Sequence, residues 1–452
     1  MATTLTSWAN NEIFKVKLTF DNGQTYTALS NDDTDYLLVS GDITETTAVT
    51  LGNPVGVMEP NTANFEILDK SNNLLSTNAS SPYYGYMRNG VKCEVFVSYD
   101  DEITWTPYGV YYTENWSSDK EDGGYSTVNI SCTDKLDYIG SLPMPTLKAY
   151  AGVNVTTLLQ NILLGIGLTS SDFNIDSTLS LQMLYAISKG DTVKEALNTI
   201  AQSLLARIFL DRAGVIQVVP AIPTKTIAYI IDDVDAEKIS VQHNKITQYN
   251  KVKLIYNKVS DRLAETLISL SNVSLEVGLN KISGLQITSD VLSIDGAYIS
   301  TSADDTSNIE KISYINYVAY QGGIDIEVYN ATSAAFYADI EVVGRITGNT
   351  DAYVESTISS DNATSASTLT LESSVIQDES KANAYVSAVA SYLKTMQQEV
   401  IITGTLPSQL TVQQYITITS DDTTIDDDYL ITEFNLQFGE SYTTTVKAVK
   451  VV

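Results

Sequence analysis

The sequence predicts a mainly β protein with an inserted α+β segment, and three observations lead to this fold class. Thr, Ser, Val, Ile and Tyr, which favour strands, are abundant, whereas the 452 residues include only 9 Pro. Apolar and polar residues alternate with a period of two near both ends of the sequence, as in half-buried strands. Between these regions, three stretches place apolar residues at the spacing of one helix face.

The first region, roughly residues 1–135, is typical of a compact antiparallel sheet or barrel. Val16, Leu18 and Phe20 alternate with polar residues and are followed by the hairpin signal "DNG". Further strands are expected in "VKCEVFVSYD", "YGVYYTENW" and "STVNISCTD", which polar turns separate.

A change of periodicity marks an α+β segment over roughly residues 136–225. Residues 154–166 form one expected helix, and Thr192 with Glu195 gives the capping-box pattern at the start of a second. A strand "RIFL", a turn "DRAG" and a strand "VIQVV" follow, so we expect this helix and hairpin to pack together. The buried face of the second helix is expected to comprise Val193, Leu197, Ile200 and Leu204.

The remainder returns to strands. A β region begins at "ITQYNKVKLIYNK", runs to about residue 350 and gives way to the Ser/Thr-rich stretch 356–374, interpreted as a loop or edge ribbon. Residues 379–397 have the pattern of an amphipathic helix. The strands "QYITITS", "YLITEFNLQF" and "YTTTVKAV" end the sequence. The first and last β regions could be two diverged copies of one barrel.

The net charge of the protein limits the classes of partner that it can bind. With 55 acidic and 26 basic residues, the formal net charge is −29, which makes tight nucleic-acid binding a poor hypothesis. A solvated acidic surface explains the charge, and so does a surface that nucleic acid must pass without sticking. The N-terminal residues do not resemble a signal peptide and no apolar run has membrane-spanning length, so we expect cytosolic synthesis and no membrane anchoring.

No residue is predicted to be catalytic, cofactor-binding or metal-binding. His243 is the only histidine and lies in a polar connection, where a structural or solvated role is expected. Cys93 and Cys132 occupy apolar-facing positions and are predicted to be buried, reduced thiols. The acidic clusters 31–36 and 421–428 do not fit a calcium loop and are interpreted as solvated turn acids. A glycosidase-type carboxylate pair stays open, although none stands out.

The order of these elements resembles the hub proteins of bacteriophage tails, the baseplate hub or late-control family, to which type VI secretion spike proteins are also similar. The resemblance covers nearly the whole sequence and rests on patterns rather than on catalytic motifs. It is carried, in chain order, by "STVNISCTDKLDYIG", a helix, "DTVKEALNTIAQSLLARIFLDRAGVIQVVP", "NKVKLIY", a "VSAVASYLKTM" helix and "YLITEFNLQF".

The resemblance implies a homotrimer in which each chain carries two tube-like antiparallel β-barrels, so that three chains match a six-fold tail tube around a central channel. The implied partners are the tail tube or distal tail protein, the tape-measure protein, a spike or other baseplate protein, and phage DNA in transit. The implied location is the tail tip or baseplate of the virion. The expected domains are a first barrel (1–135), an inserted α+β domain (136–225), strands returning to the barrel ring (226–265), an additional β domain (266–375), and a helix with strands completing the second barrel (376–452).

Two other functions remain open from the sequence. A distal-tail adaptor or carbohydrate-binding tail protein would also suit a β-rich chain with 28 Tyr. A tail-associated cell-wall hydrolase is expected less, because some relatives carry a C-terminal hydrolase or receptor-binding extension whereas this sequence ends at "KAVKVV", directly after the last expected strand.

Overall fold

The computed structural model is mainly β, with four helices and 26 strands among the residues it describes. The mainly β fold class with an α+β insertion is confirmed. The described residues are 12–31, 36–47, 58–121, 124–145, 150–186, 192–242, 249–261, 265–287, 291–300, 312–320, 323–358, 367–395, 398–421, 423, 425–439 and 441–450.

Seven strands from the first part of the chain form a closed barrel. Their order is β3-β2-β1-β5-β6-β7-β4, and β4 pairs back with β3 to close it. Val16 and Leu18 are fully buried in its interior, as their alternation predicts. The strands are β1 (Ile13–Thr19), β2 (Thr25–Leu29), β3 (Tyr36–Thr46), β4 (Thr62–Asp69), β5 (Lys92–Ser98), β6 (Thr106–Lys120) and β7 (Ser126–Asp134).

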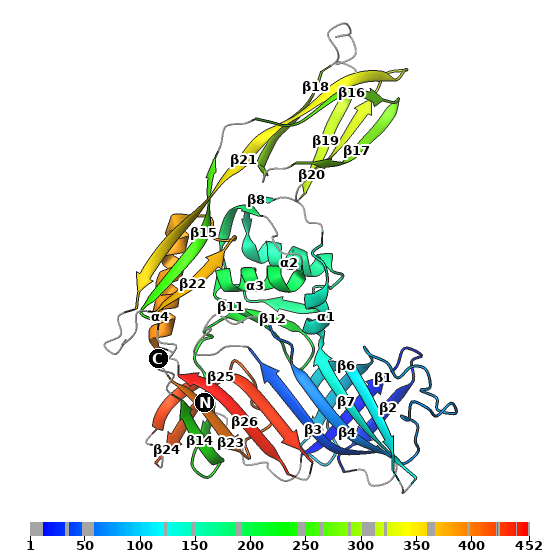
Figure 1. Ribbon diagram of the computed structural model, residues 1–452, viewed down its shortest axis with the longest axis vertical. Coiled ribbons are helices and arrows are strands. Elements are labelled where there is room, and N and C mark those ends of the chain that lie inside the picture. Colours follow the sequence, from blue (N-terminus) through cyan, green and yellow to red (C-terminus); the bar gives the residue numbers. More distant parts are fainter. Residues whose placement is uncertain are drawn as a thin grey trace.

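A second, six-stranded half continues the same sheet. Its strand order is β14-β23-β26-β25-β24-β13, and β25 pairs antiparallel with β3 of the first barrel. Figure 1 shows the two halves side by side at the foot of the molecule. The strands are β13 (Ile227–Ile231), β14 (Ala236–Gln242), β23 (Glu399–Gly404), β24 (Tyr415–Ser420), β25 (Ile425–Phe438) and β26 (Thr443–Lys450).

The two halves repeat one arrangement of strands. The order β14-β23-β26-β25-β24 matches β3-β4-β7-β6-β5, with antiparallel pairing at every step. Register shifts also fall at matching places. β14 has a shift between Ala236 and Lys238, as β3 has between Leu38 and Ser40. β25 has a shift between Ile431 and Glu433, as β6 has between Thr113 and Asn115. Five strands of the second half thus repeat the order and register of the first, although among the described strands only the first half closes into a barrel.

An α+β unit lies above the barrels. Helix α3 (Val193–Leu204) starts with the predicted capping box, in which Thr192 and Glu195 exchange side-chain and backbone hydrogen bonds. The hairpin β11 (Ala206–Leu210) and β12 (Ile216–Pro220) follows it, also as predicted. Helix α1 and three short strands of this unit were not predicted from the sequence. The other elements are α1 (Lys135–Ser141), α2 (Val155–Gly165), β8 (Tyr150–Asn154), β9 (Phe173–Ile175) and β10 (Gln182–Ala186).

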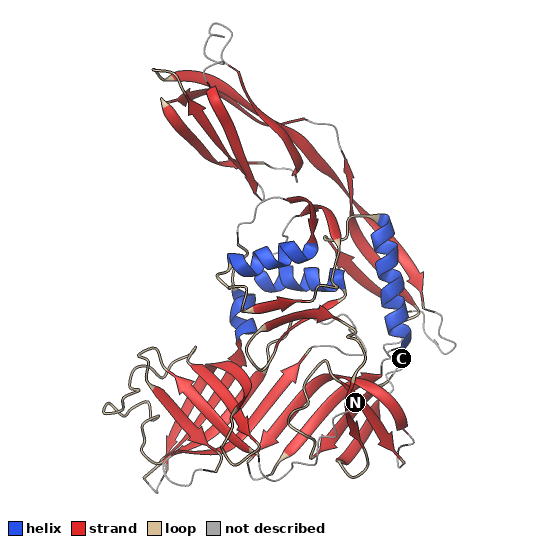
Figure 2. Ribbon diagram, turned by 180° about the vertical axis from the view of Figure 1, so that it is seen from behind, coloured by secondary structure: helices blue, strands red, loops and turns tan. Residues whose placement is uncertain are grey.

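An elongated β arm extends away from the α+β unit (Figures 1 and 2). The long strand β21 (Phe336–Thr357) runs through it and pairs with β15, β16 and β18. Helix α4 (Glu379–Thr395) matches the predicted helix and packs against β15 and β21 at the base. The other strands are β15 (Lys251–Asp261), β16 (Glu265–Leu275), β17 (Gly278–Gln286), β18 (Val291–Ser300), β19 (Ile312–Tyr320), β20 (Gly323–Asn330) and β22 (Thr368–Ser373).

The base of the arm differs from the sequence-based assignment. Residues 226–265 were expected to return to the barrel ring, but only β13 and β14 lie in that sheet, and β15 pairs with β21 and β22. Val252, Leu254 and Tyr256 of β15 bury their side chains against α4. The Ser/Thr-rich stretch supplies β22, the edge strand of this sheet, which agrees with the edge-ribbon interpretation.

Cys93 and Cys132 lie together inside the first barrel. Both are fully buried and free, as predicted. A hydrogen bond with Cys132, together with burial, raises the pKa of Cys93. The two residues sit on β5 and β7 with β6 between them, so two strand spacings of roughly 4.8 Å separate their backbones. The distance between the two backbones is therefore larger than the Cα separation of about 7 Å that a disulfide tolerates, which agrees with two free thiols.

Candidate functional site: the joint between the barrels and the α+β unit

The tip of the β11–β12 hairpin reaches the seam between the two barrel halves. Asp211 shapes this turn: its Oδ1 accepts hydrogen bonds from the backbone N–H groups of Ala213 (3.0 Å) and Val215 (2.9 Å). Gly214 adopts φ +83°, a conformation that favours glycine. This rigid turn presents the side chain of Arg212 to the barrels.

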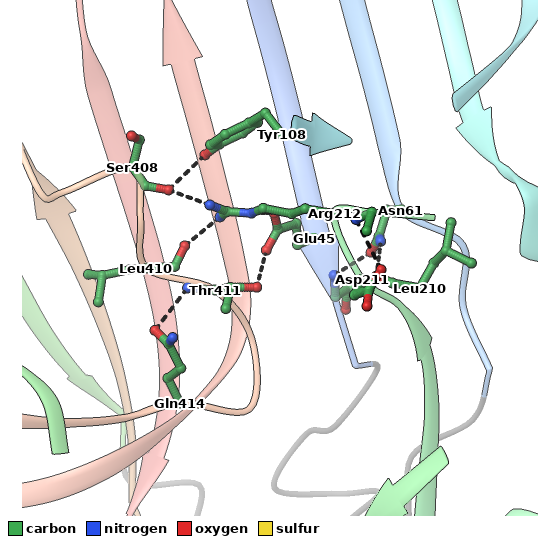
Figure 3. Close-up of polar contacts among 12 residues, drawn as sticks. Glu45, Asn61, Tyr108, Leu210, Asp211, Arg212, Ser408, Leu410, Thr411 and Gln414 are labelled. Carbon is green, nitrogen blue, oxygen red and sulfur yellow. Dashed lines mark hydrogen bonds and ion pairs between the residues drawn. The ribbon is translucent and has the colours of Figure 1, made fainter. Parts of the chain in front are cut away.

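Arg212 binds residues of both halves at once (Figure 3). Its Nε donates to Oε1 of Glu45 on β3 at 2.5 Å. Its two terminal nitrogens donate to the carbonyl oxygens of Ser408 (2.7 Å) and Leu410 (2.5 Å), which precede β24 in the second half. The other carboxylate oxygen of Glu45 accepts from the Thr411 hydroxyl at 2.7 Å. One guanidinium therefore ties the α+β unit to both halves of the sheet.

Aromatic rings and burial strengthen this contact. The guanidinium carbon lies 4.1 Å from the ring centroid of Tyr108 on β6 and 5.6 Å from that of Phe434 on β25. The Arg212 side chain is 18% exposed and that of Glu45 only 4%. Burial lowers the pKa of Arg212, but the charge of Glu45 outweighs it, so the pKa is raised overall and the arginine stays charged.

A second contact joins the same hairpin to the first barrel. The amide of Asn61 donates to the carbonyl oxygen of Leu210 at 3.1 Å, and its Oδ1 accepts from the backbone of Thr46 at 2.9 Å. The backbone N–H of Asn61 donates to Asp134 at 2.8 Å. Asp134 also accepts from Leu136 at 2.8 Å and so caps α1. The end of β7, the start of α1 and the hairpin are thus fixed together.

The buried carboxyl of Asp134 should make stability depend on pH. Burial raises the pKa of Asp134 to about 7, although its hydrogen bonds from the backbone N–H groups of Asn61 and Leu136 act to lower it. An unfolded aspartate ionises near pH 4, so between about pH 4 and pH 7 the folded chain binds one more proton. The contribution of Asp134 to the free energy of unfolding therefore decreases as pH rises through this window, by at most about 1.4 kcal/mol per pH unit.

Urea denaturation of the wild type and of Asp134→Asn between pH 4.5 and 8 measures this effect. We expect the stability of the wild type relative to the variant to fall with rising pH and to level off above pH 7. Asp101→Asn, at an exposed turn, serves as the control and should keep the wild-type slope. Parallel pH profiles for wild type and Asp134→Asn would contradict the prediction.

Polar side chains cover the outer face of the β3–β25 seam. Asn435 donates to Asp42 at 2.6 Å and to the Thr44 hydroxyl at 2.9 Å, and Gln437 donates to Asp42 at 3.4 Å. A groove of about 660 Å³ crosses this face over β3, β4, β7 and β25. Asp42 and Glu66 lie in its described lining, which contains no Lys or Arg.

The residues considered for chemistry in the sequence do not come together. His243 lies outside the described residues, as do the central positions of the 31–36 cluster. In the 421–428 cluster, Asp427 and Asp428 are part of β25 rather than of a turn, and they pair with Lys450 (2.5 Å) and Lys225 (2.7 Å). Within the described part of the chain, no group of three or more His, Cys, Asp or Glu could hold a metal ion. None of the described helices could span a membrane.

The residues of the joint were not predicted from the sequence. The pattern "DRAG" predicted a turn but no role for Arg212, and Glu45, Asn61 and Asp134 carry no local signal of a contact. The only available signal was an arginine in the middle of a tight turn between two apolar strands. The partners of that arginine lie 167 and 196 positions away in sequence, which no local pattern reveals.

The same fold, with two joined β halves and an α+β unit, occurs in solved phage tail proteins. The 43 kDa tail protein of prophage MuSo2 from Shewanella oneidensis aligns with a TM-score of 0.56 at 10% identity, over 97% of this chain and 98% of that one. The tail protein from Neisseria meningitidis gives the same TM-score and identity, over 97% and 96%. The sequence matches no model of a known family and no curated protein. The resemblance to phage tail proteins is confirmed at the level of the fold.

Proposed function

We propose that the protein is a structural hub of a bacteriophage tail tip or baseplate, a homotrimer that joins a six-fold tail tube to a three-fold tip or spike. The internal repeat carries this proposal. Each chain supplies one closed barrel and a second half that repeats its strand order, which we interpret as a second copy, and β25 and β3 hold the two side by side. Three chains would supply the six barrels that a six-fold tube requires. The solved tail proteins of the same fold support the assignment to a phage tail.

The polar seam face suits the wall of a central channel. Carboxylates, amides and hydroxyls line the groove on this face beside apolar residues such as Phe65 and Phe438, and a net charge of −29 repels a phosphate backbone. DNA or a tape-measure protein would then pass without binding. The hub is made in the host cytoplasm and resides in the virion, where the tail tube or distal tail protein and a spike or other baseplate protein are its neighbours.

We assign no enzymatic activity to the chain. The buried carboxylates of the joint, Glu45 and Asp134, are occupied by contacts that connect structural elements. We retain the five-part division into domains predicted from the sequence, with β15 moved to the additional β domain. A zymogram against purified peptidoglycan tests this assignment, because a lytic band abolished by changing one carboxylate would identify a hydrolase instead.

Light scattering on the purified protein tests the proposed assembly. We expect a mass near three times 49.3 kDa, at high concentration or after addition of the tail-tube protein. Apolar and backbone contacts between barrels must carry this association, because the acidic chains repel one another. A stable dimer or tetramer, or a monomer that persists with the tube protein present, would overturn the trimeric hub.

A further inference from the structure

In the barrel region, β14 and the second half of β6 each have an edge without a partner among the described residues, as does the outer edge of β13. β14 pairs with β23 on one side only and forms one end of the 13-stranded sheet. β6 pairs with β5 only through Thr106–Tyr112, so the stretch from Glu114 to Lys120 has β7 on one side and no strand on the other. Edges of this kind are free to pair with another chain.

The internal repeat shows what should cover the edges of β14 and β6. β25 is the counterpart of β6, and β14 is the counterpart of β3. In β25, the segment Glu433–Phe438 is covered by β3, and the side chains of Phe434, Leu436 and Phe438 are buried. The matching segment of β6, Asn115–Lys120, is mostly exposed. The same contact is made within the chain in one copy and left open in the other.

We propose that β14 of one chain pairs antiparallel with the second half of β6 of a neighbouring copy, which repeats the β25–β3 seam between chains. This inference rests on the trimeric hub proposed above. In the internal seam, Gln437 faces Asp42 and Leu436 faces Ile43. Replacing each of these residues by its counterpart on β6 or β14 gives the pairs expected between copies. The facing pairs are Ser117 with Gln242, Ser118 with Val241, Asp119 with Ser240, and Lys120 with Ile239.

The side chains of these pairs are chemically complementary. In the internal seam, the amides of Asn435 and Gln437 on β25 donate to Asp42 on β3. In the proposed seam the roles are reversed, because Asp119 lies on β6 and the donors Ser240 and Gln242 lie on β14. A hydroxyl or amide therefore still faces a carboxylate, and the backbone groups of both exposed edges gain partners.

The contact also closes a ring. Each chain offers one β14 edge and one β6 edge, so the interface is head to tail, and Figure 1 draws these strands in opposite halves of the sheet. Within a chain the sheet runs β6-β7-β4-β3-β25-β26-β23-β14. Pairing of β14 with the next β6 makes this eight-stranded segment continuous through three copies and closes it into a ring.

Disulfide trapping in the full-length protein tests the register. One variant carries Asp119→Cys with Ser240→Cys, and a second carries Ser118→Cys with Val241→Cys. Neighbouring positions of an antiparallel pair alternate in hydrogen bonding and face opposite sides of the sheet, so one of the two pairs has the closer spacing. We expect mild oxidation to link copies into covalent dimers and trimers in at least one variant. The native Cys93 and Cys132 are buried and do not compete.

Mismatched variants provide the control. Asp119→Cys with Val241→Cys directs the two thiols to opposite faces and should give no linked trimer, and neither should each single substitution. Light scattering on the same samples separates the two proposals. A trimer in which neither matched pair links, or in which mismatched pairs link equally well, overturns the seam and leaves the hub intact. A protein that never forms a trimer beside its tube partner overturns the hub itself.

Discussion

Replacing Arg212 by alanine is expected to destabilise the protein by about 3 to 5 kcal/mol, because the change leaves the carboxylate of Glu45 buried without its cation. The carbonyl oxygens of Ser408 and Leu410 lose their donor in the same step. The packing of the guanidinium against Tyr108 is lost as well. Urea denaturation followed by circular dichroism measures the change in the free energy of unfolding.

Arg88→Ala is the matched control. Arg88 also pairs with an aspartate, Asp21, but the side chains are 65% and 51% exposed, so its removal should cost no more than about 1 kcal/mol. Arg212→Lys should lie between wild type and Arg212→Ala, since an ammonium keeps the charge but cannot reach three oxygens in the planar geometry of a guanidinium. Equal stability of Arg212→Ala and Arg88→Ala would show that the joint contributes little to folding.

Leu197→Ala is expected to lower the free energy of unfolding of the α+β unit by about 2 to 5 kcal/mol. Leu197 is fully buried, with an exposed fraction of 0%. It lies in the core that α3 shares with α1, α2 and the β11–β12 hairpin. Truncation removes buried methyl groups and leaves a cavity, which both destabilise the native state. Because this core positions the hairpin that carries Arg212, assembly of the trimer should weaken together with folding.

Alanine substitutions at two less buried leucines provide a comparison for the stability loss in Leu197→Ala. The sequence predicted Leu204 to be part of the same buried face, but it is only partly buried, so Leu204→Ala should cost less than Leu197→Ala. Leu164 on α2 is 41% exposed and its truncation should change stability least. Thermal denaturation of the three variants should rank them in this order. No loss of stability in Leu197→Ala would mean that the assigned face of α3 does not form the core.

Local patterns in the sequence were sufficient to predict the elements whose signals are short in range. The capping box at Thr192, the alternation around Val16 and the helix 379–397 each depend on neighbours within a few positions, and the structure confirms all three. The side chains of Cys93 and Cys132 were likewise predicted to be buried from alternation alone. Helix α1 was missed because it has only seven residues, too few to establish a period.

Contacts between distant segments were decided by the tertiary structure alone. β15 has the alternation of a barrel strand but pairs with β21, about a hundred residues later, since both bury apolar side chains under α4. Arg207 begins the predicted strand "RIFL", yet it is buried and donates to the Tyr392 hydroxyl on α4 at 2.8 Å.

The joint shows the same division. The sequence determined that "DRAG" turns between two strands, because Asp211 and Gly214 act within the turn itself. It could not determine that Arg212 meets Glu45 and the loop before β24, since folding alone brings these segments together. The physical reason is range: turn and helix signals arise from adjacent residues, whereas a buried ion pair depends on how whole sheets pack.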